Sequence, residues 1–178
     1  MDAGVHCLQT EAEHVKPTEI LALLLEFHRD KLTLRQRHAA VARHVGNYSF
    51  NNTYQYVIAR EDVHLAWLET AIADLGGTPA QLSEPELSSP GKKKDSFLPL
   101  VQQDGREADA FVTRWRPRTG EVTNARHRTM LQVILGESLE HKRFFDQIAA
   151  GRDDVLGRRA DGAGTGDGVL GVRWLGDR

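Results

Sequence analysis

The positions of the prolines are the strongest constraint on how this chain can fold. All six lie between residues 17 and 117, and they leave two long stretches, 18–78 and 118–178, without any. Proline inside a helix removes a backbone hydrogen bond and clashes with the preceding turn, so its absence permits long helices. No strand-like alternation of useful length occurs in these stretches. The sequence therefore predicts an all-α protein.

Four helices are expected, each bounded by turn signals. The predicted ranges are 17–45, 49–75, 98–115 and, starting at residue 120 or 123, up to 150. Pro17 suits a first helical turn, and Ser49 or Asn51 would cap the second helix. Gly76 and Pro117 mark the expected ends of the second and third helices. A polar connector over 77–97 is long enough to return along a whole bundle.

The ends of the chain differ from this helical part. We expect an N-terminal extension over 1–16, one bundle domain over 17–150, and a tail over 151–178. The tail holds eight of the sixteen glycines, which predicts a flexible stretch up to Gly168. Beyond it the chain is apolar again, with Val169, Leu170, Val172, Trp174 and Leu175. Such an end is typical of a docking segment.

Composition excludes several classes of protein. The formal charge of −2 argues against a nucleic-acid partner, whose binding domain would usually be strongly basic. The longest apolar run, from residue 20 to 25, is far shorter than the roughly 20 residues of a membrane span. The first residues lack the pattern of a signal peptide. One cysteine, Cys7, forbids an internal disulfide or a multi-cysteine metal site. We expect a soluble cytoplasmic protein with no membrane partner.

The second and fourth helices each carry a glutamate and a histidine in the middle of an apolar stripe. In the second helix, positions spaced alternately three and four apart read Tyr54, Val57, Glu61, His64, Leu68, Ala71 and Leu75. The same spacing in the fourth helix gives His127, Met130, Ile134, Glu137, His141, Phe144 and Ile148, with Glu140 alongside. Burying a carboxylate costs several kcal/mol unless a charge compensates it. Something positive is therefore expected between these helices.

The other two helices offer further polar groups. Lys31 and His38 lie on the stripe of the first helix, which Glu26 and His28 flank. The third helix has Asp104 on its stripe, and Glu107 at the edge. Lys31 could itself supply the missing positive charge.

These residues resemble the ferritin-like superfamily, and its rubrerythrin-like members in particular. That fold is a four-helix bundle with a long crossover between its second and third helices. Its di-metal members supply one glutamate from each of two helices and a Glu-x-x-His pair from each of the others. Glu61 and His64 match such a pair, with Tyr54 seven residues before it. Glu107 lies 33 residues before Glu140, close to the family's separation between ligands.

The resemblance implies a site for two iron ions, with manganese as a possible substitute. No glutamate stands three residues before His141 in the fourth helix. The ligands there would be Glu137 and His141, four residues apart on one face, or alternatively Glu140, with His141 as a neighbour. In the first helix either Glu26 or His28 would be the ligand. Such a centre would reduce O₂ or peroxide, with iron oxidation, peroxide removal or oxidation of an organic molecule as the outcome.

A second interpretation needs no metal. Glu61 and His64 would then form a buried pair that Lys31 or Arg35 neutralises across the bundle, and the chain would be a scaffold or assembly protein. In either case we expect a homo-oligomer, a dimer or a larger multiple. Residues 169–175 would dock on their own bundle, on a sister subunit, or on a separate partner or protein shell.

Overall fold

The computed structural model describes residues 17–88, 91, 96–152 and 155–156 of the 178-residue chain. Four helices account for most of them: α1 Pro17–Ala42, α2 Tyr48–Asp74, α3 Leu98–Gly120 and α4 Ala125–Ala149. The described residues form no strand. The predicted all-α four-helix bundle is confirmed. The predicted N-terminal extension and nearly all of the glycine-rich tail, including residues 169–175, lie outside the described residues.

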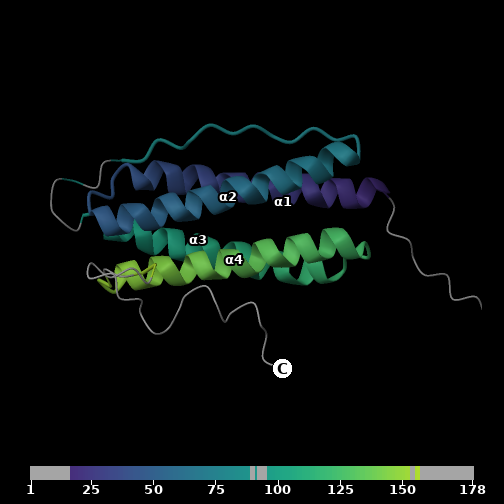
Figure 1. Cartoon of the computed structure of the whole chain (residues 1–178). Coiled ribbons are helices and arrows are strands. Elements are labelled where there is room, and N and C mark those ends of the chain that lie inside the picture. The colour runs from purple at the N-terminus through teal and green to yellow at the C-terminus, as the bar shows by residue number, and fades with distance from the viewer. Residues whose placement is uncertain (1–16, 89–90, 92–95, 153–154, 157–178) are drawn as a thin grey trace, which may run out of the picture.

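The helices form two layers (Figure 1). α1 and α2 make one layer and α3 and α4 the other, with α1 packed on α3 and α2 on α4. α1 and α4 run in one direction along the bundle, and α2 and α3 run in the other. No helix in the described part of the chain is long and apolar enough to cross a membrane.

Side-chain caps and one glycine set the ends of two helices. Asn47 and Asn124 each accept a hydrogen bond from the backbone N–H three residues on, at 3.1 Å, and so cap α2 and α4. The cap of α2 is thus Asn47 rather than the expected Ser49 or Asn51. α2 closes at Gly76, whose φ of 75° is a left-handed conformation that favours glycine.

α3 differs from the prediction at its C-terminal end. It continues through Pro117 to Gly120, instead of ending near residue 115. Contacts with α1 hold this last turn: Trp115 Nε1 donates to Asp30 Oδ2 at 2.9 Å, and Arg118 pairs with Glu26 at 2.6 Å. The Arg118 guanidinium also stacks over the Trp115 ring at 4.2 Å. Tertiary contacts therefore outweigh the one hydrogen bond that proline removes.

The chain after α2 lies against the outside of α1. Gln36 Nε2 donates to the Leu82 carbonyl at 2.6 Å, and Arg43 pairs with Glu84 at 2.5 Å. Figure 1 shows this connector running back along the bundle towards the start of α3.

The core has two apolar clusters with a polar layer between them. One cluster gathers around Phe27, Leu68 and Trp115, and the other around Tyr54, Val101 and Phe145. All four helices also carry buried polar side chains, eight of which form this layer. The polar residues are Lys31, His38, Glu61, His64, Asp104, Glu137, Ser138 and His141. This buried polar layer positions the candidate site.

Candidate functional site

A buried lysine lies at the centre of the polar layer. Lys31 Nζ donates hydrogen bonds to Glu61 Oε1 at 2.8 Å and to Ser138 Oγ at 3.2 Å. Lys31 and Glu61 are both fully buried. The other carboxylate oxygen of Glu61 lies 2.9 Å from His38 Nδ1. We call Lys31, His38, Glu61 and Ser138 the Lys31 cluster.

Glu61 is ionised in this environment. Burial by itself raises the pKa of its carboxyl, but the charges of His38 and Lys31 and the His38 hydrogen bond outweigh that effect. The pKa of Glu61 therefore lies well below its ordinary value. A carboxylate that accepts from His38 requires Nδ1 of that ring to carry its proton. A lysine from α1 thus neutralises a glutamate from α2.

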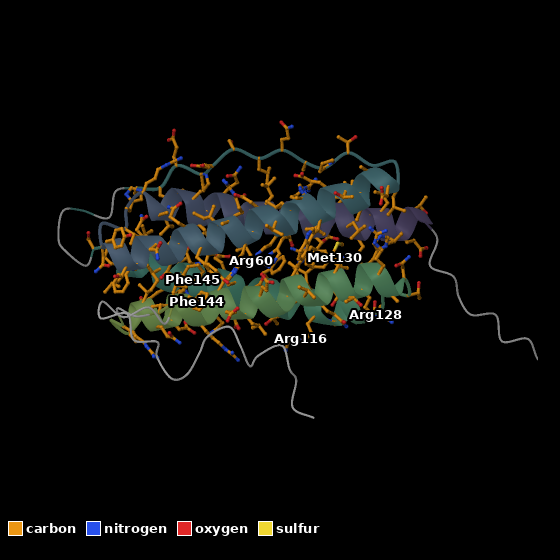
Figure 2. All side chains as sticks on the ribbon, in the orientation of Figure 1. Arg60, Arg116, Arg128, Met130, Phe144 and Phe145 are labelled. Atoms are coloured by element: carbon orange, nitrogen blue, oxygen red, sulfur yellow. The ribbon has the colours of Figure 1, made fainter. Side chains whose placement is uncertain are left out.

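A second carboxylate, on α4, is neutralised by residues of α2. Arg60 donates two hydrogen bonds to Glu137, from Nε to Oε2 at 2.9 Å and from Nη2 to Oε1 at 2.6 Å. His64 Nε2 lies 2.9 Å from Glu137 Oε2. Figure 2 shows Arg60 reaching the space between α2 and α4. We call Arg60, His64 and Glu137 the Glu137 cluster.

Two pKa values in the Glu137 cluster are shifted downwards, for different reasons. Burial raises the pKa of Glu137, but the hydrogen bonds from His64 and Arg60 outweigh it and lower the pKa to about 2. Burial lowers the pKa of His64, and the hydrogen bond to Glu137 opposes this only in part. At neutral pH the cluster therefore holds a carboxylate, a guanidinium and a neutral imidazole.

His141 joins the two clusters. Its ring stacks on the His64 ring with centroids 6.2 Å apart, and its Nδ1 lies 3.9 Å from Glu61 Oε1. Burial lowers the pKa of His141 well below its ordinary value, and the nearby Lys31 charge lowers it further. The Nδ1 atoms of His64 and His141 have no hydrogen-bond partner among the described residues.

α3 contributes an aspartate to the same layer. Asp104 is fully buried, accepts a hydrogen bond from the Tyr54 hydroxyl, and pairs with Arg37 Nε at 2.7 Å. Burial raises the pKa of Asp104 despite the charges of His38 and Arg37. Burial and the Asp104 charge also raise the pKa of Tyr54 well above its ordinary value.

The structure brings four of the eight predicted site residues together: Glu61, His64, Glu137 and His141. Glu26 lies at the surface, where it pairs with Arg114 and Arg118. His28 is buried but lies 3.4 Å from the exposed Glu69. Glu107 accepts a hydrogen bond from Gln103 of its own helix at 2.6 Å. Glu140 is half-buried, and its charge acts on Tyr56 and Arg60 at the edge of the bundle.

Sequence reasoning did not assign several members of the layer to the site. His38 and Asp104 lie on the core-facing stripes that the spacing predicted, and this position could have identified them as members of the site. Arg60 precedes Glu61 and Ser138 follows Glu137, so neither lies on a predicted core-facing stripe. Nothing in the spacing therefore indicated that they belong to the site. The expected partner Arg35 instead pairs with Asp62 at the surface, at 2.8 Å.

These donors, as they are placed, do not fit a centre for two metal ions. All four carboxylate oxygens of Glu61 and Glu137 already accept hydrogen bonds from Lys31, His38, Arg60 or His64. Lys31 adds a fixed positive charge where a cation would lie. Within the described residues, no three His, Cys, Asp or Glu side chains are grouped so that they could hold a metal ion.

Comparison with models of protein families and with curated proteins found no match.

From the Lys31–Glu61 contact we predict how removing the lysine charge changes the stability of the fold. Lys31→Met would leave the buried Glu61 carboxylate with only its contacts to His38 and His141. We expect the free energy of unfolding to fall by about 3–5 kcal/mol, the usual cost of breaking a buried ion pair. Urea unfolding measures this. The matched control is Arg35→Met, which removes the exposed pair with Asp62 and should cost about 0–1 kcal/mol.

The double variant Lys31→Met with Glu61→Leu removes both charges, and it should be more stable than the single Lys31→Met variant. Equal costs for Lys31→Met and Arg35→Met would show that Lys31 does not neutralise Glu61.

The pKa shifts predict loss of stability in mild acid. His64 and His141 have lowered pKa values in the folded state, so below about pH 6.5 the unfolded chain binds more protons than the folded chain. The free energy of unfolding should therefore decrease as pH falls below about 6.5. Glu61 and Glu137 add to this below their ordinary pKa of 4.5, whereas Asp104, whose pKa is raised, acts in the opposite direction.

Urea unfolding at a series of pH values between 5 and 8 measures the effect. His141→Gln should flatten the profile between pH 5 and 6.5. A wild-type profile that is flat across this range would contradict the prediction.

Proposed function

We propose that this chain is a metal-free ferritin-like bundle that works as a scaffold or assembly protein. The observation that carries the proposal is the contact of Lys31 Nζ with Glu61 Oε1 at 2.8 Å, between two fully buried side chains. In di-metal bundles the charge of such a glutamate is balanced by metal ions. Here a cation of the chain itself has that role.

The Glu137 cluster supports the same proposal. Arg60 binds both carboxylate oxygens of Glu137, and the arginine fork is well matched to a carboxylate. Arginine cannot be deprotonated in proteins, so this charge does not leave when pH changes. Glu61 and Glu137 were both predicted metal ligands, and both are buried. Each is thus neutralised by a cationic side chain of the chain itself, Glu61 by Lys31 and Glu137 by Arg60.

The di-iron or manganese oxidoreductase is the second candidate. It is favoured by the Nδ1 atoms of His64 and His141, which have no hydrogen-bond partner within the described residues, because neutral imidazole is a common metal ligand. The ligands would come from Glu61, His64, His141, Glu137 or Glu140, and Glu107. Binding would require Lys31 and Arg60 to leave the carboxylates that they now contact.

Metal loading separates the two candidates. The purified full chain would be incubated with ferrous iron under anaerobic conditions, and separately with manganese, then freed of excess metal and subjected to elemental analysis. Because Lys31 and Arg60 already neutralise the carboxylates, we expect substoichiometric metal. About two ions per chain, the content of di-metal carboxylate bundles, would overturn the metal-free proposal.

Two variants identify where any metal is bound. Loss of bound metal in Glu61→Gln, with retention in Glu26→Gln, would support the di-iron candidate. Metal that persists in both variants would be bound elsewhere on the chain.

Self-association is part of the proposed assembly role. Closed symmetric assemblies are the usual form of soluble oligomers, and Val63 leaves apolar surface exposed on α2. Light scattering of the full chain at micromolar concentration should therefore give at least the mass of a dimer. A monomeric mass would contradict this.

A further inference from the structure

An apolar groove lies between α2 and α4, on the outside of the bundle. It has a volume of about 370 Å³ and is lined by Trp67, Thr70, Ala71, Arg126, His127, Met130 and Val133. This volume is within the range of about 300–1,000 Å³ that is usual for ligand sites. Met130 lies between the ribbons of α2 and α4 (Figure 2).

The groove exposes side chains that are costly to leave in water. Trp67 is 38% exposed and forms one wall, while Met130 and Val133 are only half-buried. The Trp67 ring also packs on His64 of the Glu137 cluster, with centroids 5.7 Å apart. An occupant of the groove would therefore cover the outer side of the polar layer as well.

We propose that residues 169–175 of the same chain occupy this groove, with Trp174 as the anchoring side chain. This segment has the chemistry that the groove requires. Val169, Leu170, Val172, Trp174 and Leu175 supply apolar surface, and tryptophan is one of the side chains enriched among the residues that anchor an interface.

The chain is long enough to reach the groove from where its described part ends. Val155 is buried and Leu156 packs on the apolar cluster that includes Ile148, close to the C-terminal end of α4. From Ala149 back to Val133 the helix spans about 24 Å, at about 1.5 Å per residue. The thirteen residues from Leu156 to Val169 can span roughly 43 Å when extended. Residues 169–175 thus reach the groove of their own molecule.

This inference goes beyond the proposed function and does not depend on it. The groove is lined by side chains of α2 and α4 that are not part of the polar layer, so the segment can bind whether or not that layer holds metal. The tether makes binding intramolecular, which raises the effective concentration of the segment.

Disulfide trapping in the full chain tests the proposal. In a Cys7→Ser background, Thr70→Cys places a thiol at the groove and Gly176→Cys places one next to the proposed anchor. The matched control combines Gly176→Cys with Ala110→Cys, an exposed position of α3 away from the groove. Diamide oxidises each pair, and non-reducing gels separate intramolecular from intermolecular disulfides.

We expect the 70–176 disulfide to form within one chain, independently of protein concentration. Its rate should be roughly tenfold or more above that of the 110–176 pair, because docking holds its thiols at a higher effective concentration. Adding Trp174→Ser should remove this difference. Equal rates of disulfide formation for the two pairs would overturn the proposal. A rate for the 70–176 pair that Trp174→Ser leaves unchanged would also overturn it. Predominantly intermolecular 70–176 disulfides would also overturn it, and would identify a second copy as the occupant.

Discussion

The ion pair between Lys31 and Glu61 is the contact on which the rest of the bundle's interior depends. A glutamate on the core face of α2 is tolerable only if a positive charge meets it in the same low-dielectric space. Lys31 supplies that charge from α1, while its second hydrogen bond, to Ser138, ties α1 to α4. One ammonium group therefore links three of the four helices.

The polar layer also limits how the helices can slide past one another. An apolar stripe tolerates a shift of one turn, because one aliphatic side chain can replace another with modest loss. A shift of one turn here would leave Glu61 or Glu137 buried without its cation, which costs several kcal/mol. Two apolar clusters flank the layer, and they supply the burial that offsets its desolvation.

Much of the secondary structure was predictable because its signals are local. The absence of proline, the spacing of apolar residues and the glycines after α2 and α4 located the helices to within a few residues. The end of α3 was not predictable in this way. The low helix propensity of Pro117 predicts that the helix ends there. The contacts of Trp115 and Arg118 with α1 instead stabilise the helix as far as Gly120.

That Glu61, His64, Glu137 and His141 face the bundle interior could be predicted from the amino-acid spacing alone, because a helical period is a property of the residues in one helix. The sequence also showed that their charges needed compensation. Which cations would provide it was decided only by the tertiary structure. Lys31 and Arg60 reach Glu61 and Glu137 from other helices, and Arg35, equally plausible from its position, turns to Asp62 at the surface. Such partners depend on the rotation and register of helices that are distant in sequence, since a charge is neutralised by what lies within a few ångströms in space.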